Sequence, residues 1–289
     1  MSLLNNKWRF FALILVLLFT NTMDFGQKKK ITKLPEHLKE ISGLTFLNDT
    51  VLVAHNDSGN YPSLYFLNLQ GKQIHKVTVE NATNKDWEDI TSDGKGNIYV
   101  GDIGNNDYNR TDLCIYKISG KEILTKETIK AEKINFSYPD QKLFPPDKKD
   151  FHYDSEGIAF SNDSIYIYTK CCTEPWDGKS YCYTLPCKAG TYKANKKYEL
   201  VIGKTGWWKD AVTAVEIKNQ KHYLLTYNRI VIYELIDGKI LFDTRILLGT
   251  ISQNEALAIN SKGLIYMADE KNKLLGGGYL YSIKNPKEK

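Results

Sequence analysis

Five short apolar runs, spread over the whole chain, each begin with a hydroxyl-bearing or acidic residue. The leading residues are Ser42, Glu88, Glu156, Thr213 and Glu255. If the runs surround one axis, three carboxylates meet at one end of it, and their repulsion raises at least one pKa unless a cation sits among them. Calcium takes about 6 to 8 oxygen ligands, whereas zinc favours His and Cys, which do not recur here. The pattern therefore predicts a Ca²⁺ ion held by these five residues. The alternative is that the Glu side chains bond to backbone amides or stay solvated at a wide channel mouth.

A second set of polar residues follows the next apolar run of each repeat. It comprises Asn56, Asp57, Asp102, Asn105, Asn106, Arg110, Lys170 and Arg229. Asn-Asp-Ser-Gly is also common turn chemistry, so any one of these loops taken alone is better explained by structure than by function. Gathered at one opening, they predict a ligand site in which Arg110, Lys170 and Arg229 hold a phosphate or carboxylate above the metal. The alternative is that these cations balance nearby acids such as Asp86, Asp154 and Asp210.

The elements that carry these residues are predicted to be strands. Each leading residue opens a run that is too short for a helix and rich in β-branched and aromatic residues. Two similar runs follow it, separated by Asn, Asp and Gly, and a looser fourth run completes the repeat. Radial repetition of four-stranded units is the β-propeller architecture. We therefore predict an all-β fold with a single five-bladed β-propeller, or a six-bladed one if a degenerate blade lies within residues 118–154.

The last repeat runs out of chain after Ser282. Its fourth strand must come from elsewhere if the propeller is to close. Residues 30–33, near the start of the chain, are predicted to supply that strand and so to close the ring.

The N-terminus has the features of a secretory signal peptide. Lys7 and Arg9 precede the ten apolar residues 10–19. Ten residues are too few to cross a bilayer, which takes about 20, although an uncleaved anchor helix is the alternative. The predicted domains are a signal peptide at 1–26 and a propeller at 27–289, with no transmembrane segment in the mature chain. The protein is thus predicted to be exported, to the periplasm or the extracellular space.

All five cysteines follow the predicted signal peptide and so meet an oxidising compartment. Cys114 lies in an apolar run and is expected to be a buried free thiol. Cys172 and Cys182 flank a turn near Asp177, and a hairpin there would set them opposite each other, so we predict a disulfide between them. Zinc is the competing explanation, disfavoured because the cysteines lack the paired spacing of structural zinc sites.

Composition limits the partners. The chain is 42% hydrophobic and has 39 Lys+Arg against 34 Asp+Glu, without a basic cluster longer than residues 28–30. This charge is too small and too scattered for nucleic-acid binding, which we do not expect. We expect a monomer.

Several motifs resemble those of secreted bacterial propellers of unassigned function, similar to SdiA-regulated-type propellers. They are residues 40–44 (EISGL), 55–59 (HNDSG), 86–90 (DWEDI), 101–106 (GDIGNN, with Arg110) and 212–214 (VTA). More distantly, the order Ser, Glu, Glu, Thr, Glu resembles the calcium-bearing ring of the calcium-activated nucleotidases (apyrases), which are five-bladed propellers. That resemblance implies calcium at the five leading residues, with Thr213 standing where the apyrases have Ser. The rest of the sequence departs strongly from the apyrases, so their nucleotide contacts are not carried over.

Two functions fit these features. The first is an exported calcium-binding module whose loop-rich mouth binds a small anionic ligand, a glycan or an extracytoplasmic protein. The alternative is a metal-dependent phosphoanhydride or phosphoester hydrolase of apyrase-like type. In that enzyme Asp57 or Asp102 would be the base, while Arg110 and Lys170 would steady the developing charge. A Ser or Cys esterase is disfavoured because the chain has no GxSxG motif.

Overall fold

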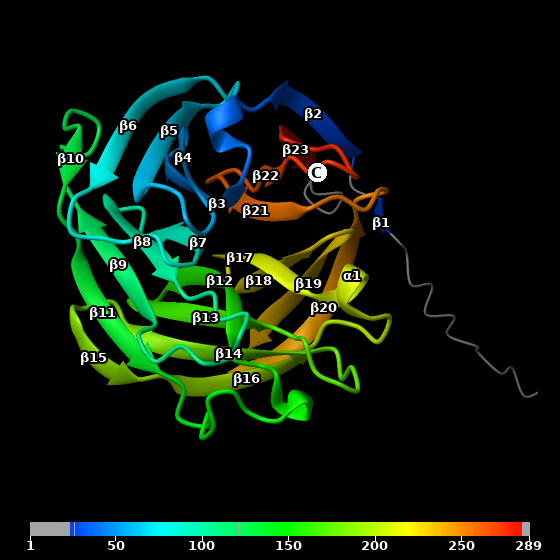
Figure 1. The fold of residues 1–289 in the computed structure, drawn as a ribbon. Coiled ribbons are helices and arrows are strands. Elements are labelled where there is room, and N and C mark those ends of the chain that lie inside the picture. Colours follow the sequence, from blue (N-terminus) through cyan, green and yellow to red (C-terminus); the bar gives the residue numbers. More distant parts are fainter. Residues whose placement is uncertain (1–23, 26, 121, 285–289) are drawn as a thin grey trace, which may run out of the picture.

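The computed structural model describes residues 24–25, 27–120 and 122–284. Within them the chain forms five sheets around a central axis, a five-bladed β-propeller (Figure 1). The described helices are three single turns: η1 (Glu36–Leu38), η2 (Lys148–Asp150) and α1 (Trp207–Asp210). The predicted all-β, five-bladed fold is therefore confirmed. The predicted signal peptide lies outside the described residues except for residues 24–25, and no described helix is long and apolar enough to cross a bilayer.

Each blade has four antiparallel strands, with the first strand nearest the axis, where it packs against the first strands of neighbouring blades. Blade 1 contains β3 (Ile41–Asn48), β4 (Val51–Asn56), β5 (Ser63–Asn68) and β6 (Gln73–Val79). Blade 2 contains β7 (Trp87–Ser92), β8 (Asn97–Asp102), β9 (Cys114–Ser119) and β11 (Glu132–Ser137). Blade 3 contains β12 (Asp154–Ser161), β13 (Ser164–Lys170), β14 (Lys179–Pro186) and β16 (Asn195–Val201). Blade 4 contains β17 (Val212–Lys218), β18 (Lys221–Thr226), β19 (Arg229–Ile236) and β20 (Lys239–Leu247).

Blade 5 joins the two ends of the chain. It contains β21 (Asn254–Ile259), β22 (Ile265–Asp269), β23 (Tyr279–Lys284) and the N-terminal strand β2 (Gln27–Lys33). Because β2 pairs antiparallel with β23, the ring is closed as predicted.

Three short strands extend the outer edges of blades in parallel pairing, which the sequence did not predict. β10 (Thr128–Ile129) pairs with β6, β15 (Gly190–Lys193) pairs with β11, and β1 (Asp24–Phe25) pairs with β20. Residues 118–154 thus contribute strands to blades 1 and 2, and the six-bladed alternative is wrong.

The core consists of five apolar layers, one between each pair of neighbouring blades. Alternation along β13 shows how a strand serves two layers. Ile165 and Ile167 face blade 2, while Tyr168 faces blade 4. Since both faces of β13 are covered, most of its side chains are buried, and each fully buried apolar side chain contributes about 1.5–3 kcal/mol.

The predicted disulfide between Cys172 and Cys182 is not present, and all five cysteines are free thiols. The register of the hairpin explains this, because Tyr168 is the residue opposite Cys182. Cys182 packs in the layer between blades 3 and 4, whereas Cys172 packs against the layer on the other face of blade 3. Cys114 is buried in β9, in the layer between blades 1 and 2.

Candidate metal centre

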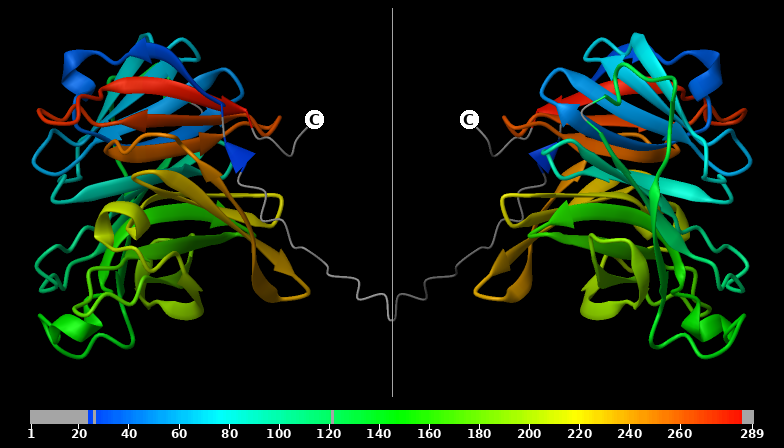
Figure 2. Two further views of the ribbon diagram at one scale, coloured as in Figure 1. Left: turned by 90° about the vertical axis from the view of Figure 1, so that its right-hand side faces the viewer. Right: turned by 90° about the vertical axis from the view of Figure 1, so that its left-hand side faces the viewer.

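The five predicted metal ligands occupy one repeated structural position. In every blade the pairing of the first and second strands shifts by one residue, and the extra residue is Ser42, Glu88, Glu156, Thr213 or Glu255. A β-bulge of this kind re-aims the extra side chain. η1, η2 and α1, which immediately precede three of these strands, lie on one face of the disc (Figure 2). The strand openings therefore lie at one end of the channel.

A cavity of about 230 Å³ lies at this end. Ser42, Glu88, Glu156 and Glu255 line it, whereas the fifth predicted ligand, Thr213, is not among its lining residues. Thr213 donates its hydroxyl to the carbonyl oxygen of Asn254, 2.6 Å away, at the start of the next blade's first strand. Ser42 makes the same kind of bond to the carbonyl oxygen of Glu88, at 2.9 Å. Both hydroxyls therefore connect neighbouring blades.

The carboxylates of blades 1 to 3 form two tight groups. Ligand oxygens of Glu88, Asp154 and Glu156 all lie within 4.8 Å of one another, and so do those of Asp57, Asp86 and Glu88. Glu88 belongs to both groups of three and links them. Acidic groups this close to one another, held by blades 1 to 3, could hold a metal ion.

Burial raises the pKa of all five acids of these two groups, and repulsion from neighbouring acids adds to the effect. Burial, followed by repulsion from Glu156 and Asp57, raises the pKa of Glu88 well above its usual value. Burial also raises the pKa of Glu156 to about 8, against the opposing effect of Lys170. The pKa of Asp86 rises to about 6 through burial and the neighbouring acids. A cation placed here would reverse these shifts, because it favours the charged forms.

Asp154 stands out in the cluster because one of its oxygens has no partner. Its side chain is fully buried, and Oδ1 accepts a hydrogen bond from the Asn105 backbone N–H at 2.7 Å. Oδ2, also buried, has no hydrogen-bond partner. Such an atom ordinarily carries a desolvation penalty of about 1–3 kcal/mol, more when charged.

The loop after β8 holds Asp154 in place and explains the GDIGNN motif. Asn105 donates its side-chain amide to the Tyr153 carbonyl at 3.0 Å, in addition to its backbone bond to Asp154. Gly104 passes so close to Asp86 and Glu88 that a methyl group at its Cα would collide with both carboxylates. The glycine therefore lets the backbone approach the acids without displacing either carboxylate.

Lys170 brings an ammonium group into the same cavity. It is buried at the end of β13, where it forms an ion pair with Glu156. Its Nζ also lies 5.3 Å from the ring centre of Trp207 and 5.8 Å from that of Tyr227. Burial alone would lower the Lys170 pKa, but Glu156, Glu255 and Asp154 hold it well above the usual value. Lys170 therefore stays charged and neutralises one of the acids around it.

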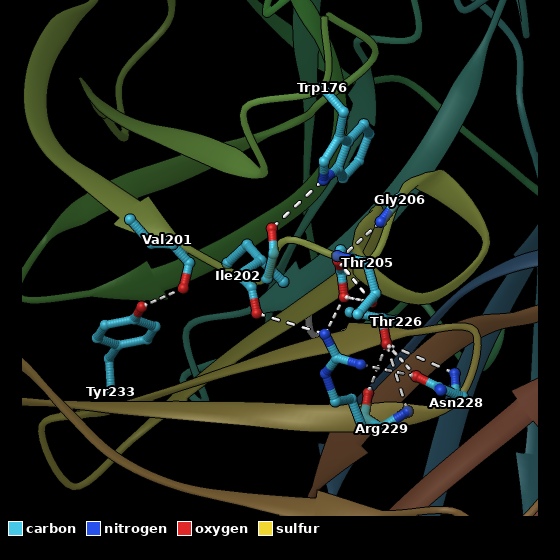
Figure 3. Close-up of polar contacts among 11 residues, drawn as sticks. Trp176, Val201, Ile202, Thr205, Gly206, Thr226, Asn228, Arg229 and Tyr233 are labelled. Carbon is cyan, nitrogen blue, oxygen red and sulfur yellow. Dashed lines mark hydrogen bonds and ion pairs between the residues drawn. The ribbon is translucent and has the colours of Figure 1, made fainter.

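The two predicted arginines are held by acids outside the cavity lining. Arg110 donates to Asp102 at 2.9 Å and to the Gly104 carbonyl at 2.7 Å. Arg229 forms a buried ion pair with Asp210 and bonds to Asn228 Oδ1 and the Ile202 carbonyl (Figure 3). Both guanidinium groups hold loops at the channel mouth. This arrangement agrees with the alternative in which the cations balance nearby acids rather than hold a ligand.

The remaining predicted ligand-binding residues divide in the same way. Asp57 and Asn106 line the cavity, Asp57 with a pKa that burial raises. Asn56 and Asn105 are buried, and Asn56 donates to the His37 carbonyl at 2.7 Å. Asn56, Asn105 and Asp102 thus hold loops rather than face the cavity.

Sequence reasoning missed three cavity residues, Trp207, Tyr227 and Gln253. Tyr227 directly follows β18, just as Asp57 directly follows β4, and this shared position was the available signal. Trp207 lies in the connector α1, outside the repeat, so the repeat pattern gave no indication of it. Burial raises the pKa of a further lining residue, Glu270, to about 7.

Comparisons with known proteins show the fold alone. No protein family and no curated protein matches the sequence. The structure is similar to that of Myxococcus xanthus glutaminyl cyclase, with 13% identity, 89% of this chain and 95% of that chain covered, and a TM-score of 0.54. It is also similar to the PQQ-bound aldose sugar dehydrogenase of Streptomyces coelicolor, with 10% identity, 90% and 98% covered, and a TM-score of 0.53. It is similar as well to the aldose sugar dehydrogenase of Escherichia coli, with 9% identity, 90% of this chain and 99% of that chain covered, and a TM-score of 0.52.

Proposed function

We propose that the protein is an exported β-propeller that binds a Ca²⁺ ion at the acidic end of its channel and holds a small anionic ligand in the cavity beside it. The proposal depends on one observation above all. Fully buried Asp154 has one oxygen without a hydrogen-bond partner, and its carboxylate has an oxygen within 4.8 Å of ligand oxygens of Glu88 and Glu156. A cation coordinated by these three residues satisfies that oxygen and removes the repulsion among them.

The donor set favours calcium over the transition metals. Both groups of three offer only carboxylate oxygens, which suit hard cations. The cluster of Asp57, Asp86, Glu88, Asp154 and Glu156 supplies enough oxygens, with water, for the 6 to 8 ligands of about 2.3–2.6 Å that Ca²⁺ takes. Compared with the ring of five predicted from the sequence, the proposed set keeps Glu88 and Glu156 and replaces the others with acids from neighbouring loops.

The cavity favours a small ligand. Its volume of about 230 Å³ lies below the range of about 300–1,000 Å³ typical of drug-sized ligands. Lys170 and the ion are its positive charges, and Trp207 and Tyr227 provide aromatic surface beside them. A carboxylate or phosphate group, carried by a small molecule, a glycan or a protein side chain, suits this arrangement.

Calcium dependence of stability tests the proposal. The mature protein, treated with EDTA and dialysed, is melted with and without millimolar Ca²⁺, and Ca²⁺ binding is measured by isothermal titration calorimetry. We expect one tightly bound ion per chain and a melting temperature that rises with Ca²⁺ and saturates. An unchanged midpoint together with no binding heat contradicts the proposal.

Asp57 is the observation that favours the hydrolase as a second candidate. It lines the cavity, belongs to the group with Asp86 and Glu88, and has a raised pKa, as a general base for ion-bound water requires. Release of phosphate from nucleoside di- and triphosphates at millimolar Ca²⁺ tests it. We expect Asp57→Asn and Glu88→Gln to abolish any release, and a wild type that releases no phosphate rules the hydrolase out.

A further inference from the structure

A second cluster with metal-binding chemistry lies in blade 3, outside the acidic cavity. It consists of His152, Cys171 and Asp177, whose ligand atoms all lie within 4.8 Å of one another. His152 Nε2 is 3.1 Å from Asp177 Oδ2, and Cys171 Sγ donates to Asp177 Oδ1 at 3.2 Å. Bonds of about 2.0–2.3 Å to a tetrahedral ion would set the ligand atoms about 3.3–3.8 Å apart, so only small side-chain adjustments are needed.

Two of the three ligands are buried, and the thiolate and imidazole among them suit transition metals. His152 is 3% exposed and Cys171 2% exposed, while the Asp177 side chain, at 32%, opens the cluster to solvent. His152 Nδ1 is buried without a hydrogen-bond partner, and either ring nitrogen of histidine can bind a metal.

The surroundings fix the positions of the ligands. The imidazole stacks on Tyr181, with ring centres 4.1 Å apart. Asp177 Oδ1 accepts a hydrogen bond from the Lys179 backbone N–H at 2.9 Å, and the Thr173 hydroxyl accepts one from the Asp177 N–H at 3.0 Å. Such supporting contacts around a set of ligands are typical of metal sites.

We propose that His152, Cys171 and Asp177 form a binding site for a zinc-class transition metal ion, separate from the calcium site. The Cys171 thiol loses its proton to solvent as the metal–sulfur bond forms, and no electron is transferred. The imidazole and one carboxylate oxygen complete three ligands. The fourth position is left for water or the Thr173 hydroxyl, whose oxygen lies 3.4 Å from Sγ.

The site joins two segments that meet only in the folded protein. His152 lies on the connector from blade 2 to blade 3, and Cys171 and Asp177 lie in the loop between β13 and β14. His152 stands two residues before Asp154, and Cys171 directly follows Lys170. The ion would therefore fix the backbone next to Asp154, one of the proposed calcium ligands, and Lys170, which lines the cavity.

Cobalt titration of the reduced, metal-free mature protein tests the proposal. Co²⁺ bound to a thiolate gives a near-ultraviolet sulfur-to-cobalt charge-transfer band, which a carboxylate site cannot give. We expect the band to saturate at one Co²⁺ per chain, to disappear on addition of Zn²⁺, and to persist in excess Ca²⁺. Because metal binding displaces the thiol proton, Co²⁺ affinity should increase from pH 6 to pH 8.

Three variants and one control complete the test. Cys171→Ser should abolish the band, and His152→Gln and Asp177→Asn should weaken Co²⁺ binding at least about tenfold. Cys172→Ser is the matched control: Cys172 lies next in the chain but packs against the layer that contains Tyr108, so the band should be unchanged. Circular dichroism of the metal-free variants checks their folding. No band in the wild type, or an equal band in Cys171→Ser, overturns the proposal.

Discussion

Replacing Asp154 by asparagine distinguishes two roles of this side chain, as a ligand of the metal ion and as a hydrogen-bond acceptor for the Asn105 loop. The amide keeps an oxygen to accept the Asn105 N–H, but it removes one negative charge from a group of three carboxylates within 4.8 Å. In metal-free protein this change relieves repulsion, so the melting temperature should stay the same or rise. With Ca²⁺ the effect has the opposite sign, because the ion loses a charged ligand.

The size of the calcium effect can be estimated. At a Ca²⁺ concentration 100 times the dissociation constant, binding stabilises the wild type by about 2.7 kcal/mol. For a domain of this size that corresponds to about 5–11 °C in melting temperature. If Asp154→Asn weakens binding only tenfold, the stabilisation at the same Ca²⁺ falls to about 1.4 kcal/mol, or about 3–6 °C.

The assay is differential scanning calorimetry of both proteins in EDTA and in Ca²⁺. Glu255→Gln is the matched control, because Glu255 lines the same cavity but belongs to neither group of three. Its calcium-induced shift should remain close to that of the wild type. If calcium raises the melting temperature of wild type and Asp154→Asn equally, the reasoning is refuted. If Asp154→Asn and Glu255→Gln lose the same part of the calcium-induced rise, the ion lies on the channel axis.

Three further predictions concern the same end of the channel. Gly104→Ala should lower both stability and Ca²⁺ affinity, measured by melting and calorimetry, because its methyl group collides with Asp86. Above pH 8, where Glu156 is ionised, Lys170→Met leaves the carboxylate buried without its cation and should destabilise metal-free protein by about 3–5 kcal/mol in urea unfolding, while calcium restores most of the loss. The pKa of Glu156 is raised to about 8, so the folded protein holds this proton more tightly than the unfolded chain does. The resulting stabilisation of the fold is complete below the ordinary pKa of 4.5 and is lost as the pH rises through about 8. The urea concentration at the unfolding midpoint, measured in EDTA, should therefore decrease as the pH is raised from 5 to 9. Saturating Ca²⁺ should make this decrease smaller.

The sequence by itself determined the architecture and much of the cavity. Strand periodicity is local, so the runs opened by Ser42, Glu88, Glu156, Thr213 and Glu255 could be recognised without knowing what they pack against. The missing fourth strand of the last blade likewise required a partner, which proved to be β2. Four of the five leading residues then line one cavity, because equivalent positions of radial repeats converge.

Only the tertiary structure decided which polar groups face one another. The hairpin register places Tyr168, not Cys172, opposite Cys182, and a shift of register cannot be read from the turn residues alone. Likewise, the approach of Asp154 to Glu88 depends on how blades 2 and 3 pack. The meeting of His152 with Cys171 joins two loops that no sequence spacing relates. Periodicity reports which face of a strand is buried, whereas distances between side chains of different blades are set by packing across the whole ring.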